Sequence, residues 1–318
     1  MRTVLAFEKP IHDVEIKILE LRRLQEEGGP DVSAQLAEAE EGLRRVQTGI
    51  YANLQPWDKV LMARHPDRPY TLDYIEGLTG DSFVEMHGDR CFGDDPAIVG
   101  GMAAFRKRPV MIIGHQKARD LKGRQYRNFG SARPEGYRKA IRLMKLAEKL
   151  QIPLVTFIDT PAADCSVASE SRGISGAIAS SMYCMSELTI PVVVVIIGEG
   201  GSGGAIGIGV GNYVMMLEHS VYSVIPPEGC AAILWKDNSL ADRAAEALRL
   251  TAQDGLSLNV VDEILEEPLG GAHRDPRAMI VSTGHAIHSA LDKLSKLLPS
   301  ELKEQRYRKF RSMGRYAP

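Results

Sequence analysis

Apolar residues recur at every third or fourth position from about residue 11 to residue 65, which is the spacing of an amphipathic helix. Gly28, Gly29 and Pro30 interrupt this pattern, and Asp31 offers a carboxylate that can cap a second helix. The pattern predicts a charged helical hairpin whose apolar stripe packs on the rest of the chain or on a partner. We assign residues 1–65 to this hairpin and residues 66–318, with helices at their C-terminal end, to a second domain.

Short apolar runs replace the helical spacing beyond residue 100, and they predict buried strands. The runs are residues 110–114, 152–158 and 191–197, with a further strand from Val221. Amphipathic segments at residues 134–150 and about 169–188 predict helices between them. Strands that alternate with helices predict an α/β domain with largely parallel pairing. A spacing of roughly forty residues suits both a doubly wound sheet and a spiral of β-β-α units, and periodicity does not separate them.

Composition narrows the function classes. The chain has 318 residues, 44% of them hydrophobic and 25% charged, which is the balance of an ordinary globular protein. A formal net charge of −2 gives no global attraction to nucleic acid. The N-terminus is too short and too soon charged for a signal peptide, and no apolar run approaches the ~18–20 residues of a membrane span, so we expect a cytoplasmic protein. The four cysteines are far apart and form no C-x-x-C, so neither a zinc ribbon nor a disulfide framework is predicted.

A glycine-rich stretch, GEGGSGG at residues 198–204, directly follows the third apolar run. One interpretation is the dinucleotide turn G-x-G-x-x-G, with Glu218 placed to bind a ribose hydroxyl. That fingerprint normally opens a nucleotide domain at its first strand, whereas here it follows a third or later strand. The helix after it would also carry Gly207, Gly209 and Gly211, each costing up to about 1 kcal/mol relative to alanine.

A second interpretation is the hydrolase elbow G-x-S-x-G, with Ser202 as the nucleophile. Its partners would be His273 and an acid, Asp237 or Asp262, which follow in the right order along the chain. This order is easily met in a chain with eight histidines and 41 acidic residues. An elbow also needs only two small neighbours beside the serine, fewer than the glycines present here. A further alternative is a tight turn that packs closely against a helix and carries no chemistry.

A third interpretation assigns the chemistry to the backbone. Five glycines in seven positions let the chain adopt positive φ and approach a ligand with no Cβ in the way. Successive N–H groups at a strand-to-helix turn then form a concave site for negative charge. Such a site suits an enolate or a developing ureido oxyanion. This interpretation accounts for more of the glycines than the other two.

Eight blocks of sequence carry a specific resemblance to a known family. They are RPYTLDYI from residue 68, HGDRCFGDDPAIVGG from 87, RPVMIIGHQK from 108, PEGYRKAIRLMKLAE from 134, TFIDTP from 156, VIIGEGGSGGAIGIGVG from 195, SVIPPEGCAAILWKD from 223 and EPLGGAHRDP from 267. They resemble the carboxyltransferase alpha subunit of bacterial-type acetyl-CoA carboxylase over nearly the whole chain. The resemblance implies a crotonase-like spiral of β-β-α units with an N-terminal helical hairpin.

The resemblance also implies an activity and its partners. The alpha subunit pairs with a homologous beta subunit in an α2β2 heterotetramer, and the active site lies between them. Carboxybiotin on a separate biotin carboxyl carrier protein gives its carboxyl group to acetyl-CoA, which becomes malonyl-CoA. A separate biotin carboxylase uses the ATP. Zinc is expected on the beta subunit and no metal on this chain.

The family's functional residues map onto the glycine stretch and a loop before it. The backbone N–H groups of Gly203 and Gly204 correspond to the oxyanion hole for the biotin ureido oxygen. The neighbouring positions expected on the biotin side are Gly200, Gly201, Ser202, Ala162, Ala163, Asp164, Arg172 and Gly173.

Basic residues are concentrated between Lys117 and Lys145, where ten Lys or Arg face only Asp120 and Glu135. This surplus predicts contacts with CoA phosphates or with an acidic carrier surface. The candidates are Lys117, Arg124 and Arg127, and residues 115–130 have the composition of a partly mobile loop. The alternative is a solvated helix face, which is what runs of charge usually form.

One stretch departs from the family's pattern. Where relatives usually read GAYPG, this chain reads AADCS at residues 162–166, and the differences continue to Ile174. Added Cβ atoms lie where the backbone approaches biotin, and the Asp164 carboxylate replaces an aromatic ring. A catalytically impaired subunit that serves as a scaffold of the complex is therefore a second hypothesis beside the active enzyme.

Overall fold

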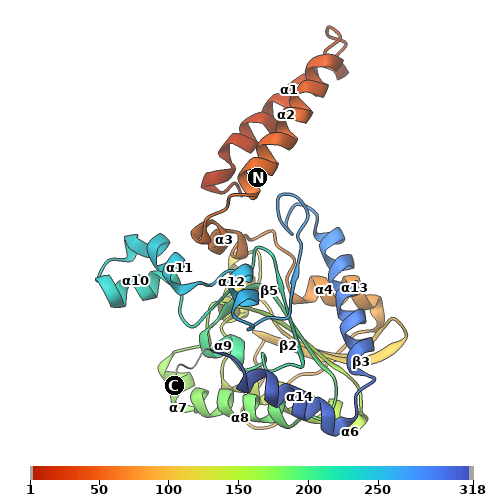
Figure 1. Ribbon diagram of the computed structural model, residues 1–318, viewed down its shortest axis with the longest axis vertical. Helices are drawn as coiled ribbons and strands as arrows, with labels where there is room; N and C mark the ends of the chain where they lie inside the picture. Colours follow the sequence, from red (N-terminus) through yellow and green to blue (C-terminus); the bar gives the residue numbers. More distant parts are fainter. Residues whose placement is uncertain (1–2, 315–318) are drawn as a thin grey trace.

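A single mixed sheet organises the chain in the computed structural model, which describes residues 3–314 (Figure 1). The strand order is β1-β2-β3-β4-β5-β6-β8, and β7 pairs with the far end of β5. Pairing is antiparallel from β1 to β3 and parallel from β3 onward. The strands are β1 (Val84–Glu85), β2 (Ile98–Phe105), β3 (Arg108–His115), β4 (Leu154–Thr160), β5 (Val192–Gly201), β6 (Tyr213–Leu217), β7 (Val221–Ser223) and β8 (Glu263–Leu265).

Helices cover both faces of this sheet, with α6 and α8 on one face and α4 and α13 on the other. Alternate residues of each strand face opposite sides, so in β5 Val192 and Val194 pack toward α6 whereas Val193 and Val195 pack toward α13. The helices are α1 (Lys9–Glu26), α2 (Ser33–Tyr51), α3 (Pro56–Ala63), α4 (Thr71–Thr79), α5 (Leu121–Tyr126), α6 (Pro134–Leu150), α7 (Val167–Ser171), α8 (Ile174–Glu187), α9 (Ser202–Ile206), α10 (Pro227–Trp235), α11 (Ala241–Leu248), α12 (Ala252–Ser257), α13 (Pro276–Leu294) and α14 (Pro299–Arg311). Within residues 3–314, no helix combines the length and apolarity needed to cross a bilayer.

The structure confirms the predicted α/β class and corrects some elements. The three apolar runs are β3, β4 and β5, and the helix at residues 134–150 is α6. β2 was not predicted, because its sequence IVGGMAAF has no continuous apolar run. The single helix predicted at about residues 169–188 is two helices, α7 and α8, because Gly173 between them has a φ of 77°.

The N-terminal pattern forms the predicted hairpin of α1 and α2, which projects from the body in Figure 1. The Asp31 carboxylate accepts a hydrogen bond from the Ser33 N–H at the start of α2, as its position suggested. Part of the apolar stripe is exposed on α1, including Ile16 and Leu19. Met185 of α8 is fully buried in the core, so this side chain offers no contact to a partner.

A buried polar cluster joins the hairpin to the body. The Glu8 carboxylate accepts a 2.5 Å hydrogen bond from the Tyr51 hydroxyl and pairs with Arg274 at 3.4 Å. His65 and His273 stack beside it with ring centroids 3.9 Å apart. Burial and the neighbouring His273 lower the pKa of His65 to about 4, so this imidazole is neutral in the fold.

Acid is expected to destabilise the buried polar cluster that joins the hairpin to the body. The pKa of His65 falls from its ordinary value of 6.5 to about 4 in the fold, so between these values the unfolded chain binds more protons. The contribution of neutral His65 to the free energy of unfolding is therefore complete above pH 6.5. It falls as the pH drops toward 4, by up to about 3 kcal/mol. Urea midpoints measured across this range should fall less steeply in His65→Gln. The exposed His12→Gln variant is the control, and equal slopes in His65→Gln and the parent would contradict the assignment.

Candidate active site

The glycine-rich stretch begins as strand rather than turn. β5 continues through Gly198, Glu199 and Gly200 to Gly201, paired with β4 on one side and with β7 on the other. The chain turns only at Ser202, which has a φ of 50°, a rare value for a residue with a side chain. α9 then begins directly at Ser202.

Most glycines here have neighbours that leave no room for a side chain. A Cβ at Gly198 would overlap the Asp159 carboxylate, and one at Gly201 would overlap the Pro161 carbonyl. A Cβ at Gly204 would lie 2.6 Å from the carbonyl carbon of Ala162, so α9 and the loop after β4 are in backbone contact. Gly203 differs, because its Cβ would meet only the tip of the Ile178 side chain, at 3.3 Å.

Two backbone donors at this turn have no acceptor outside α9 among residues 3–314. Gly203 and Gly204 are the second and third residues of α9, where a helix has no carbonyl four residues back to accept their N–H groups. Outside α9, no residue in the described part of the chain accepts a hydrogen bond from either N–H. Two adjacent N–H groups at such a turn attract an anionic or partly anionic oxygen.

The space beside this strand is small. The cavity that borders Gly200 and Gly201 has a volume of about 20 Å³, enough for roughly one water molecule. Arg64 and Glu199 also line it. This cavity cannot enclose an acyl-CoA or a biotin ring.

The hydrolase interpretation lacks its partners. His273 stacks on His65 at the hairpin joint, and the Asp237 carboxylate caps Ser239. The Asp262 carboxylate accepts a hydrogen bond from the Val214 N–H and pairs with Lys309. None of these three side chains serves Ser202.

The dinucleotide interpretation also fails on the structure. α9 has five residues, too few to present the long helix dipole of a nucleotide-binding turn. The Glu218 carboxylate accepts a hydrogen bond from the Glu267 N–H instead of pointing to the glycine stretch as a free ribose ligand.

The loop between β4 and α8 is ordered by its own side chains. The Asp164 carboxylate accepts hydrogen bonds from the hydroxyls of Ser166 and Ser169, and Ser166 caps α7. These bonds lower the pKa of Asp164 although burial raises it. The residue that replaces an expected aromatic ring is therefore an anchor of this loop.

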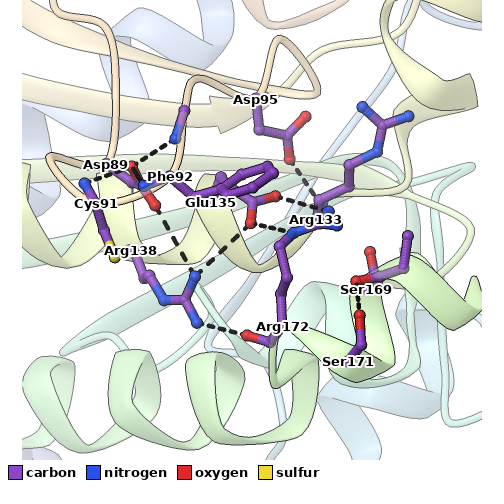
Figure 2. A network of polar contacts seen from close by, with 12 residues as sticks. Asp89, Cys91, Phe92, Asp95, Arg133, Glu135, Arg138, Ser169, Ser171 and Arg172 are labelled. Atoms are coloured by element: carbon purple, nitrogen blue, oxygen red, sulfur yellow. Dashed lines mark hydrogen bonds and ion pairs between the residues drawn. The ribbon is translucent and has the colours of Figure 1, made fainter.

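Arg172 holds the far end of the same loop (Figure 2). Its guanidinium donates to both carboxylate oxygens of the buried Glu135, at 2.7 and 3.2 Å, and stacks on the Phe92 ring. Arg138 in turn donates to the Arg172 carbonyl and lies near Glu135. Arg172 is thus committed to holding the loop, which differs from the expected contact with biotin.

One group of side chains meets the geometric needs of a metal site. Ligand atoms of Glu8, His65 and His273 lie within 4.8 Å of one another. However, the Thr3 carbonyl accepts from His65 Nε2, and the Asp67 N–H donates to His65 Nδ1. A metal there would have to break one of these bonds, so we assign no metal to this cluster.

Comparison with known proteins identifies the family. A family profile described as "Acetyl co-enzyme A carboxylase carboxyltransferase-like" matches residues 4–314. The acetyl-CoA carboxylase carboxyl transferase subunit alpha of Geobacillus sp. (strain WCH70) is 52% identical over 313 residues, covering 98% of this chain and 96% of the relative. That of Geobacter metallireducens is 51% identical and covers 98% of each. This chain belongs to the acetyl-CoA carboxylase carboxyltransferase alpha-subunit family.

Solved structures support the fold of this carboxyltransferase subunit. The transcarboxylase 12S structure has a TM-score of 0.58 at 18% identity, covering 77% of this chain and 42% of that one. A Pseudomonas malonate decarboxylase hetero-tetramer in complex with coenzyme A has a TM-score of 0.57 at 15% identity, covering 70% and 86%. The crotonase-like carboxyltransferase fold expected from the sequence is confirmed. The chain is a subunit of a biotin-dependent, multisubunit acetyl-CoA carboxylase of fatty acid biosynthesis.

The three basic candidates of this alpha subunit are largely engaged within the chain. Lys117 lies between Asp159 and Glu199, with Nζ 2.7 and 2.8 Å from their carboxylates and only 14% of its side chain exposed. It is therefore not free to bind a phosphate, contrary to the expectation. Arg124 donates to the Ala118 carbonyl and Arg127 to the Pro96 carbonyl, and both stay half-buried.

The segment at residues 115–130 also differs from the loop expected there. It contains α5, capped by the Asp120 carboxylate, and the left-handed Asn128 and Phe129. Two further side chains at this end of the sheet, Arg64 and Glu228, were not candidates from the sequence. A lone charged residue in a helix gives no signal of its partner 164 positions away.

Proposed function

We propose that this chain supplies the alpha half of the carboxyltransferase site, with the Gly203 and Gly204 N–H groups binding the ureido oxygen of carboxybiotin. The observation that carries the proposal is that, within the part of the chain that the structure describes, these two adjacent donors have no acceptor outside α9. Gly203 also leaves room for a ligand, because a Cβ there would contact only Ile178. An oxygen that gains negative charge during transfer is stabilised by two fixed donors of this kind.

The surrounding residues have supporting roles in this proposal. Carboxybiotin, when bound, supplies the carboxyl group that converts acetyl-CoA to malonyl-CoA. Gly200 and Gly201 continue the strand that fixes the turn, and Ser202 adopts the positive φ that aims the next two N–H groups. Ala162, Ala163 and Asp164 form the wall behind the turn, ended by Arg172 and Gly173.

The partners follow from the incompleteness of this half-site. A cavity of about 20 Å³ beside Gly200 and Gly201 supports a site completed by another subunit. We propose a beta subunit in an α2β2 assembly, which brings the zinc and the hole for the thioester enolate. The biotin carboxyl carrier protein and biotin carboxylase act beside it, in the cytoplasm. Arg124 and Arg127 remain proposed contacts for the carrier or for CoA.

The division into domains is part of the same proposal. Residues 1–65 are a hairpin unit and residues 66–318 the carboxyltransferase unit. The projection of α1 and α2 from the body supports a separate hairpin, whereas α3, at residues 56–63, packs against Val221 and Ala245 of the body (Figure 1).

Co-expression with the beta subunit of the same genome tests the function. The complex is purified and assayed for malonyl-CoA decarboxylation with biocytin, the reverse of carboxyl transfer. Activity supports the enzyme, whereas a stable but silent complex supports the scaffold hypothesis. The altered loop motivates that second hypothesis, since residues 162–163 contact the turn directly.

The Ser202 hydroxyl is expected to be dispensable. Ser202→Ala should lower turnover by no more than about tenfold, or ~1.4 kcal/mol, because the backbone performs the chemistry. A fluorophosphonate should leave the parent complex unlabelled at this position. Stoichiometric labelling at Ser202 would instead establish a nucleophile.

A further inference from the structure

A chain of ion pairs runs through the glycine-rich end of β5, where Glu199 is its central member. Lys117 bridges the carboxylates of Asp159 and Glu199, and Arg64 bridges the carboxylates of Glu199 and Glu228. Asp159 is 4% exposed and Glu199 10% exposed, so the inner part of the chain is shielded from solvent. Five charges from distant parts of the sequence thus meet at the carboxyl ends of the central strands.

The fold makes room for these charges. Gly198 has no Cβ, and one there would overlap the Asp159 carboxylate. Gly130 has a φ of 82°, and a Cβ there would lie 2.8 Å from the Lys117 side chain. Two glycines are therefore needed for the ion pairs rather than for a ligand.

Glu199 is the centre of this chain and lies within the glycine stretch. Its Oε2 accepts from Lys117 at 2.8 Å and its Oε1 accepts from Arg64 at 2.7 Å. Its own N–H donates to the Asp159 carboxylate at 3.0 Å. Burial raises the pKa of Glu199, but the charges of Lys117 and Arg64 outweigh it and hold this pKa below its usual range. Both the side chain and the backbone of Glu199 are fixed, three residues before Ser202.

Arg64 extends the chain to a separate part of the molecule. Arg64 ends α3, and Glu228 lies in the first turn of α10. α10 and α11 project together from the body at the left of Figure 1. Pro226 and Pro227, which lead into α10, line the same cavity as Gly200 and Gly201. The position of this α10–α11 arm is thereby tied to the strand that carries the glycine turn.

We propose that Glu199 is a positioning residue for carboxyl transfer, which fixes the glycine turn and couples it through Arg64 and Glu228 to the α10–α11 arm. This proposal rests on the proposed function of the Gly203 and Gly204 donors. Glu199 touches no substrate and acts through the backbone that follows it. A displacement of about 1 Å at a reacting group can cost about 10²-fold in rate, so loosening this strand affects turnover more than binding.

The test compares variants of the assembled alpha and beta complex. Glu199→Gln removes the charge with little change of shape and should lower kcat at least tenfold, with KM within twofold of the parent. Glu228→Gln cuts only the outer pair and should lower kcat about threefold. Arg64→Met combined with Glu228→Gln should be no worse than Arg64→Met alone, because the proposed effect of Glu228 passes through Arg64.

Asp292→Asn is the matched control. Asp292 pairs with Arg108 at 2.9 Å, with exposures of 45% and 35%, similar to the 39% and 29% of Glu228 and Arg64. The Arg108–Asp292 pair links the start of β3 to α13, at the opposite end of the strands. Asp292→Asn should leave kcat within twofold, although it removes an equivalent ion pair.

The outcomes separate this inference from the proposed function. A kcat within twofold in both Glu199→Gln and Glu228→Gln, or an equal loss in Asp292→Asn, overturns the positioning role and leaves the N–H assignment intact. If Glu199→Gln does not fold, Glu228→Gln decides alone, and an unchanged kcat then rejects the coupling. Normal turnover in a Gly203 variant would reject the proposed function whatever the ion pairs do.

Discussion

Replacing Gly203 with valine is expected to lower carboxyl transfer by the assembled complex at least about 100-fold while the complex still forms. Loss of one oxyanion donor typically costs about 10²–10³ in rate, and a side chain beside the donors should displace the oxygen they bind. The fold should persist, because outside α9 and its chain neighbours a Cβ at Gly203 would meet only the flexible end of Ile178, at 3.3 Å. Malonyl-CoA decarboxylation measures the rate, and co-purification with the beta subunit measures assembly.

Gly204→Ala is a contrasting variant, because Gly204 is buried against the loop. Its Cβ would lie 2.6 Å from the Ala162 carbonyl carbon and 2.7 Å from the Ala163 nitrogen, both backbone atoms that cannot simply rotate away. Gly204→Ala should therefore lose stability, by about 1–3 kcal/mol, together with activity. If Gly203→Val assembles and keeps near-normal turnover, the oxyanion assignment is wrong.

The sequence predicted those parts of the fold whose burial is continuous. β3, β4 and β5 are covered on both faces, so each contains a run of mostly apolar residues that stands out along the chain. β2 lies in the same sheet but contains Gly100 and Gly101, which are needed where Leu143 and the β1 backbone approach. Because these glycines interrupt the apolar residues of β2, the sequence of this strand has no long apolar run that would predict it.

The extent of the glycine turn was not predictable from the same pattern. Glycine in a sequence indicates conformational freedom or close contact, and only the partner distinguishes the two. Here Gly198 and Gly201 have contacts that exclude a Cβ, whereas a Cβ at Gly203 would meet only the end of the Ile178 side chain, at 3.3 Å. Ser202, the one residue of the turn with a side chain, carries the positive φ that the glycines were expected to provide.

The sequence shows how many basic residues lie between Lys117 and Lys145, but it did not predict which groups their side chains contact. The ten basic residues between Lys117 and Lys145 gave the expectation of a surface for phosphates or an acidic carrier. In the fold, Lys139 pairs with Asp94, and Arg142 donates to backbone carbonyls of residues 87–88. Partners such as these lie 45 or more positions away, and a count of charges within one segment cannot include them.

The chain without its partner is expected to show no carboxyl transfer, which is the largest effect predicted here. The alpha half offers two donors and, beside Gly200 and Gly201, a cavity of about 20 Å³, which is far too small for acetyl-CoA. Exposed apolar side chains such as Leu19 on α1 also indicate surface that a partner can cover. Light scattering of the co-purified pair should give the mass of two alpha and two beta subunits, and activity should appear only in that fraction.

A catalytically active alpha monomer would contradict both the half-site and the assembly. A complex of the expected mass that stays silent would instead place the fault in the loop at residues 162–174. In that case the combined change Ala162→Gly, Asp164→Tyr, Cys165→Pro, Ser166→Gly and Ala168→Gly should restore turnover. Asp164 anchors the present loop through Ser166 and Ser169, so the substitutions must be made together. Recovery of activity would show that the turn at Gly203 was competent throughout and that the altered loop had blocked it.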